Sequence, residues 1–147
     1  MMKNILFGTL ILVPVISYAH THVCANVGKT MELGLFDAIA KDLNIDTSAI
    51  QQDKTKVELI DISPVSKVYA ELLAKVDYED ALSNGRDMLP LSEYVSSYYD
   101  DDAKTITAKY TYLNNKGKKD VFIATSIMNK DECSIRFNGY ITLAREF

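Results

Sequence analysis

The first half of the chain contains a segment whose apolar residues have helical spacing, followed by a segment whose composition is typical of a strand. Residues 27–43 carry apolar side chains three or four positions apart, which predicts a helix even though Gly34 lowers its propensity. The apolar positions of this helix are Val27, Met31, Leu35, Phe36, Ile39, Ala40 and Leu43. A polar stretch at 44–53 follows, and the β-branched residues of 56–62 then predict a strand.

Helical spacing returns after this strand. We expect Ser63 to cap a second helix whose first residue is Pro64, and Asn84-Gly85 to end it. Its predicted apolar face consists of Val65, Val68, Tyr69, Leu72 and Val76, with Glu71 and Lys75 paired four apart on the other side. Residues 68–78 also alternate as a strand would, but their Ala, Leu, Glu and Lys favour a helix. A further short helix is expected within 91–99.

The last third of the chain alternates with a period of two and predicts three strands, at 104–113, 121–128 and 133–143. Polar turns at 114–119 and 129–132 join them, so we expect an antiparallel meander with one buried face. The predicted buried positions of its first and third strands are Ile106, Ala108, Tyr110, Tyr112, Cys133, Ile135, Phe137, Ile141 and Leu143. The expected fold class is α+β, with the N-terminal helix or helices packed on an antiparallel sheet that ends in this three-stranded C-terminal meander.

The first 19 residues have the pattern of a secretory signal peptide. Lys3 precedes a largely apolar run at 5–16, and Ser17 and Ala19 place small residues three before and one before a cut. The run is shorter than the roughly 20 residues that cross a bilayer. We therefore expect residues 20–147 to be released as a single compact α+β domain, in the periplasm or outside the cell, with no membrane span.

Composition narrows the class of protein. The chain has 147 residues, 48% of them hydrophobic, and a net charge of −4, which becomes −5 without Lys3. It is too apolar for a disordered chain and too acidic for a nucleic-acid binder, but its charge suits a basic partner. The only two cysteines, Cys24 and Cys133, are expected to form a disulfide in an oxidising compartment, because they lack the close spacing of metal-binding or redox thiols.

Histidine is confined to the start of the predicted mature chain, at His20 and His22. Triad-type nucleophilic catalysis needs a rigidly held base, so this placement argues against it and we expect no enzyme. A free amine on His20 and an imidazole at the third position could surround Cu(II) or Ni(II) in a square plane. The alternative is a solvated terminus without a function.

Tyrosines and acidic residues form the candidate recognition surface, because a tyrosine ring suits half-buried contacts. The predicted partner-binding residues are Tyr94, Tyr98, Tyr99, Asp100, Asp101 and Asp102, and the alternative for them is core packing and a solvated loop. We expect an exported protein that binds another, basic, protein, such as an inhibitor or immunity-type protein against a toxin or cell-wall hydrolase. The alternatives are a small-molecule or copper/nickel carrier and a carboxylate-dependent hydrolase.

Overall fold

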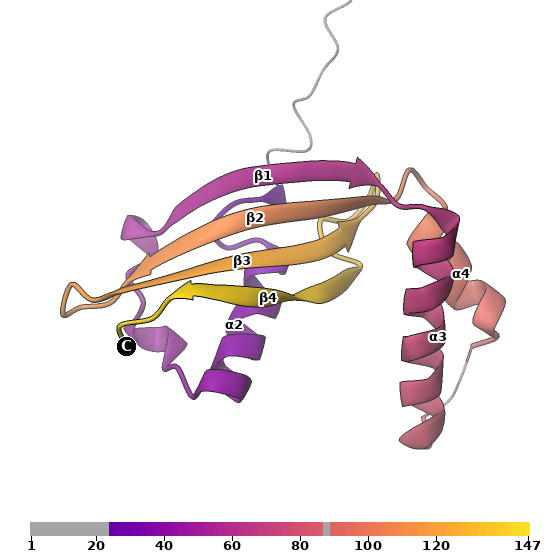
Figure 1. Ribbon diagram of the computed structural model, residues 1–147, viewed down its shortest axis with the longest axis horizontal. Helices are drawn as coiled ribbons and strands as arrows, with labels where there is room; N and C mark the ends of the chain where they lie inside the picture. The colour runs from indigo at the N-terminus through magenta and orange to yellow at the C-terminus, as the bar shows by residue number, and fades with distance from the viewer. Residues whose placement is uncertain (1–23, 87–88) are drawn as a thin grey trace, which may run out of the picture.

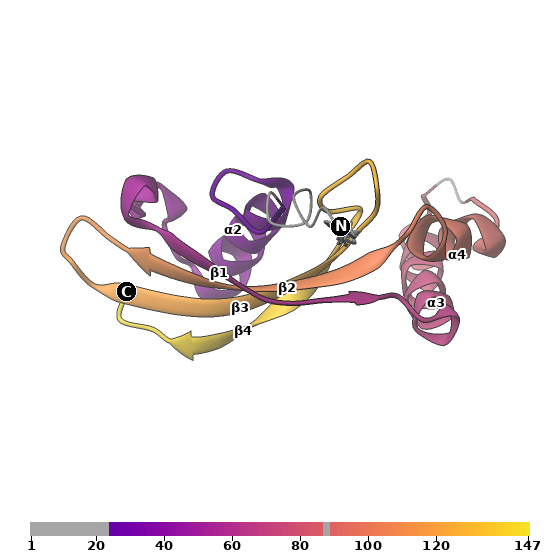
Figure 2. The same ribbon diagram turned by 90° about the horizontal axis from the view of Figure 1, so that it is seen from above.

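A helix, α2, lies across one face of a four-stranded antiparallel sheet, and a pair of helices, α3 and α4, packs at one end of it (Figures 1 and 2). The computed structural model describes residues 24–86 and 89–147. Along the sheet the strands follow the order β1-β2-β3-β4, so the predicted C-terminal meander gains β1 as a fourth member and the α+β fold class is confirmed. The elements are α2 (Thr30–Leu43), β1 (Lys56–Pro64), α3 (Lys67–Ser83), α4 (Leu91–Tyr99), β2 (Lys104–Leu113), β3 (Lys119–Met128) and β4 (Arg136–Ala144), with 3₁₀ turns at Thr47–Ala49 and Gln52–Lys54.

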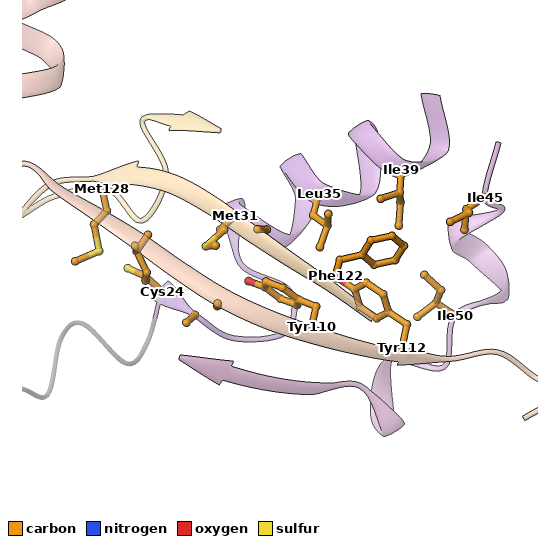
Figure 3. Packing of buried hydrophobic residues seen from close by; sticks show 14 residues of the cluster. Cys24, Met31, Leu35, Ile39, Ile45, Ile50, Tyr110, Tyr112, Phe122 and Met128 are labelled. Carbon is orange, nitrogen blue, oxygen red and sulfur yellow. The ribbon is translucent and has the colours of Figure 1, made fainter. Parts of the chain in front are cut away.

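The main core forms between α2 and the sheet (Figure 3). The alternation predicted for β2 is confirmed, since Ile106, Ala108, Tyr110 and Tyr112 are fully buried. Phe122 of β3 packs beside Tyr112, their ring centroids 6.1 Å apart. From α2, the residues that reach these rings are Met31, Leu35 and Ile39, each with no solvent exposure.

Gly34 allows α2 to lie close to β4. A Cβ at this position would be 3.0 Å from the ring of Phe137, which is closer than side chains normally approach. Glycine lowers the helix propensity here, but it permits a shorter distance between α2 and the sheet than a larger residue would.

A second, smaller cluster joins α3 and α4 to the end of the sheet. Its members are Val65, Ala70, Leu73, Ala74, Tyr98, Ala103 and Ile127. Ile127 belongs to the sheet face that α2 does not cover, so the helical pair closes the end of that face. None of the described helices is long and apolar enough to cross a membrane.

The helix over the ambiguous segment is confirmed, but its predicted start is wrong. Ser66 is the cap, its Oγ accepting a hydrogen bond from the Tyr69 amide at 3.2 Å, and Pro64 ends β1. The strand extends this far because the Val65 amide still donates to the Ala103 carbonyl, at 3.1 Å. The predicted pairing of Glu71 with Lys75 is replaced by the pairs Lys67–Glu71 and Lys75–Glu79, at 4.0 and 3.8 Å.

Cys24 and Cys133 form a disulfide. It links the segment before α2 to the segment before β4, and both cysteines lie against the main core. The bond joins residues 109 positions apart, so the covalent loop that it closes contains most of the domain.

The variant Gly34→Ala should be less stable than the parent protein. At an open helix position this change gains about 1 kcal/mol. Here the new methyl group meets Phe137, so we expect a net loss of about 1–2 kcal/mol in the free energy of unfolding, measured by urea denaturation. Adding Phe137→Leu should restore part of the lost stability. A Gly34→Ala protein more stable than the parent would show that the space between α2 and Phe137 can hold a methyl group.

Replacing both cysteines by serine should lower the free energy of unfolding by about 2–5 kcal/mol, because the unfolded chain regains the freedom of a long loop. Denaturation of the parent protein under reducing conditions is the matched control and should give the same loss. A loss below about 1 kcal/mol would mean that the bond contributes little to the fold.

Candidate functional site

The sheet face opposite α2 is uncovered over most of its length (Figure 2). On β2 this face carries threonines, and Thr107 contacts Thr125 of β3 with 3.2 Å between the hydroxyl oxygens. Towards β4 the face becomes aliphatic: Ile123 is the cross-strand partner of Ile141. Ile141 and Leu143 are 58% and 53% exposed. The open face therefore presents hydrocarbon to solvent along its β4 side.

The prediction that Ile141 and Leu143 share the buried face of β4 with Phe137 is wrong. Pairing with β3 shifts between Phe137 and Gly139, so Asn138 is an extra residue that reverses the alternation. Gly139 adopts the positive φ of 114° at this bulge. Beyond it, Tyr140 faces α2 and Ile141 faces outward.

The helix α3 also exposes the apolar stripe that was predicted to be buried. Val68, Leu72 and Val76 are 78%, 57% and 49% exposed and stand four residues apart, so they form one continuous row. The helix instead buries three alanines, Ala70, Ala74 and Ala81, together with Leu73. The term aliphatic surface is used below for Val68, Leu72, Val76, Val121, Ile123, Ile141 and Leu143.

Tyr69 connects the two parts of the aliphatic surface. It lies three residues from Leu72 on α3 and lines a hollow of about 330 Å³ on the open face of the sheet. The other residues of this hollow are Ile123, Thr125, Asn138, Gly139, Tyr140 and Ile141. A partner that contacts the sheet here also meets α3.

A charged network fixes α3 and α4 against β4. Arg136 donates two hydrogen bonds to Asp77, at 2.7 and 2.8 Å, and the Tyr98 hydroxyl donates to the same carboxylate at 2.7 Å. Arg136 also donates to Asn138 Oδ1 at 2.6 Å. Asn138 Nδ2 in turn donates to the Tyr69 hydroxyl oxygen at 3.5 Å, so the network reaches from α3 to the bulge of β4 and includes Tyr69.

The electrostatics of this network favour its ionised form. Partial burial by itself would raise the pKa of Asp77, but the hydrogen bonds from Arg136 and Tyr98 hold that pKa below its ordinary value. The hydrogen bonds to Asp77 raise the pKa of Arg136, and burial raises the pKa of Tyr98. Arg136 therefore stays protonated, and the Asp77 carboxylate neutralises its charge.

The predicted recognition residues lie around α4, but they do not form a single exposed patch. Tyr98 is buried in the second cluster, and Tyr94 packs edge-on against Tyr78. Tyr99 is 44% exposed, and Asp100 accepts a hydrogen bond from Ser96.

The remaining two acidic residues of that prediction, Asp101 and Asp102, occupy a turn with positive φ angles. Their carboxylates lie 3.0 Å from Lys130 and 2.6 Å from Lys104, respectively. Both ion pairs lie at the surface, because the side chains of Asp101 and Asp102 are 58% and 68% exposed. Residues 99–102 are therefore all accessible, whereas Tyr98 is not.

Two other carboxylates are buried away from the surface. Glu32 accepts hydrogen bonds from the Gly28 amide at 2.6 Å and the Tyr112 hydroxyl at 3.2 Å, and burial raises the pKa of its side chain. Asp120 accepts from the amides of Glu146 and Phe147, at 2.6 and 3.2 Å, and so holds the C-terminal residues. Both have no solvent exposure and act in the fold.

Over residues 24–86 and 89–147, no three His, Cys, Asp or Glu side chains are grouped to hold a metal ion. His20 and His22, the predicted copper or nickel ligands, lie outside the described residues, as does the predicted signal peptide. Comparison of the chain with protein-family models, curated proteins and solved structures found no match.

Sequence reasoning missed the Asp77–Arg136 pair and the outward turn of Ile141. The two charges are 59 residues apart, so no local pattern links them. The one available signal for the bulge was the Asn138-Gly139 dipeptide inside an otherwise alternating strand.

The variant Asp77→Asn should be less stable at neutral pH, because Arg136 loses its charged partner in a half-buried position. We expect a loss of about 2 kcal/mol in the free energy of unfolding. Glu71→Gln, which removes an exposed partner of Lys67 on the same helix, should cost below about 0.5 kcal/mol.

The same variant should change the acid response. Because the pKa of Asp77 is depressed in the folded protein, its contribution is complete above its unfolded pKa of about 3.9 and is lost as the pH falls through the folded value. Stability measured between about pH 6 and pH 2 should therefore fall less steeply for Asp77→Asn than for the parent. Parallel stability curves for the two proteins would show that an ionised Asp77 does not stabilise the contact between α3 and β4.

Proposed function

We propose that the protein acts by binding another protein, as an exported inhibitor or immunity-type protein that blocks a basic toxin or cell-wall hydrolase. The observation that carries the proposal is the aliphatic surface. Val68, Leu72 and Val76 in one row on α3, and Ile141 and Leu143 on β4, are large aliphatic side chains that stay exposed on a folded domain. Such exposed apolar residues are typical of protein interaction sites.

The position of this surface supports the same function. The side chains come from a sheet and from a helix that the Asp77–Arg136 pair holds rigidly against it. A preformed surface loses little conformational freedom on binding, so more of the contact energy contributes to affinity. Tyr69 adds an aromatic ring at its centre, a residue type enriched at such contacts.

Charge supports a basic partner. The predicted mature chain has a net charge of −5, which accelerates encounter with a positively charged protein. The signal-like residues 1–19 and the Cys24–Cys133 disulfide are compatible with export.

The test is capture followed by inhibition. The oxidised protein, immobilised, should retain a basic protein from a periplasmic or extracellular extract, identified by mass spectrometry, and the purified pair should show stoichiometric loss of the captured protein's activity. The variants Leu72→Lys and Ile141→Lys should each weaken binding at least tenfold, about 1.4 kcal/mol.

Leu33→Lys is the matched control, because Leu33 is a 52% exposed leucine on α2, on the other side of the sheet, and it should leave affinity unchanged. Weakening by Tyr99→Ala together with unchanged binding of Leu72→Lys would move the site to α4. Specific capture of no protein by the folded chain would refute the proposal.

A further inference from the structure

The two edges of the sheet differ in how well they are protected against strand pairing. β1 carries Lys56, Glu58 and Asp61 and ends in Pro64, residue types that discourage another strand from adding to an edge. β4 has no proline and no lysine, and its only charged residue, Arg136, is bound to Asp77. Bulges at Asn138 and Leu143 interrupt the β4 edge, and the regular stretch open to strand pairing is Gly139–Thr142 between them (Figure 1).

A hollow lies on each side of this edge. The open-face hollow described above has about 330 Å³, and a second hollow of about 530 Å³ lies between β4 and α2. Both are lined by Asn138, Gly139 and Tyr140, so they meet across the strand itself. A strand added to β4 would send alternate side chains into the two hollows, because successive side chains of a strand point to opposite faces.

The α2-side hollow contains one carboxylate that is not paired with a cation of the described residues. Asp42 lines it, and its carboxylate accepts a hydrogen bond from the Tyr140 hydroxyl at 3.4 Å; among the described residues no Lys or Arg pairs with it. The charge of Arg136, which also lines this hollow, is already matched by Asp77. Arg145 lies beyond the lining residues and donates to the carbonyls of Leu43 and Phe147. A lysine or arginine is therefore the side chain that this hollow fits.

The open-face hollow is mostly apolar. Ile123 and Ile141 form one wall and Tyr69 of α3 forms the other. Aliphatic side chains would bury hydrocarbon there that is now exposed. The two hollows together specify a pattern of alternating basic and aliphatic residues.

We propose that β4 is the docking edge for an extended segment of the partner protein, which pairs with residues 139–142 and alternates basic side chains over Asp42 with aliphatic side chains against Tyr69 and Ile141. This inference rests on the proposed function and names the chemistry of the partner segment. Hydrogen bonds between the two backbones would provide affinity, and the two hollows would determine which side chains the partner segment carries.

The experiment uses a synthetic octapeptide of alternating lysine and valine, compared with one of alternating glutamate and valine, and measures binding to the full oxidised protein by fluorescence anisotropy. The lysine peptide should bind at least tenfold more tightly. Asp42→Lys should reverse that preference, and Ile141→Asp should weaken the lysine peptide at least tenfold. Asp37→Lys is the matched control: it changes the same charge on an exposed residue of α2 that does not line the hollow.

Strand addition has a signature that charge attraction lacks. Methylating the amides of one alternate set of peptide residues should abolish binding, and methylating the other set should not, because one set faces β4 and the other faces solvent. Equal effects of the two sets, or an equal loss with Asp37→Lys, would overturn the inference.

Two further outcomes separate this inference from its rivals. A parent protein that sediments as a dimer and becomes a monomer with Ile141→Asp would show that a second copy of the chain occupies the edge, which overturns it. A partner captured by the parent with undiminished affinity for Asp42→Lys and Ile141→Asp would overturn the docking edge and leave the proposed function standing.

Discussion

The architecture depends on α2, which covers one face of the sheet, and only part of the length of that face. The 14 residues of α2 extend about 21 Å, whereas the ten residues of β2 or β3 extend about 33 Å. A helix of this length shields part of one sheet face. On the opposite face, the insertion of α3 and α4 between β1 and β2 supplies the second core, around Ile127 at one end of the sheet. The sheet residues of the aliphatic surface lie on that opposite face, beyond this second core.

The bulge at Asn138 determines what this uncovered part displays. Without the extra residue, strict alternation would carry Ile141 and Leu143 towards α2 together with Phe137. With it, Tyr140 turns inward and the aliphatic residues turn outward. Asn138 at this bulge also accepts a hydrogen bond from Arg136, which binds Asp77 of α3. The bulge therefore influences both the position of the helical pair and the side chains displayed along the sheet edge.

Local patterns were enough to predict the elements but not all of their faces. The alternation at 104–113 succeeded because β2 is an inner strand, paired with β3 without a shift, and Tyr110 and Tyr112 are buried as its period requires. The pattern failed on β4, where register depends on pairing with β3. It failed again on α3, because alanines allow a closer approach to α4 than Leu72 and Val76 would.

The candidate site was harder to predict, for the same reason. Tyr98 looked like a recognition residue, and it is buried because its hydroxyl has a partner in Asp77, 21 residues earlier. Amphipathic rings serve cores and surfaces equally well, so composition alone does not separate the two roles. The accessible aliphatic residues were visible in the sequence, but their exposure follows from contacts between elements.

The disulfide gives the domain an unusual mechanical character. A pulling force applied at residues 24 and 147 is carried across the bond, so only the 14 residues after Cys133 can extend, by about 50 Å at roughly 3.5 Å per residue. The reduced chain could lengthen by roughly 400 Å under the same load. A translocating motor that grips either end would therefore meet a closed ring of backbone, and it would have to pass two strands of chain at once or wait for the bond to be reduced.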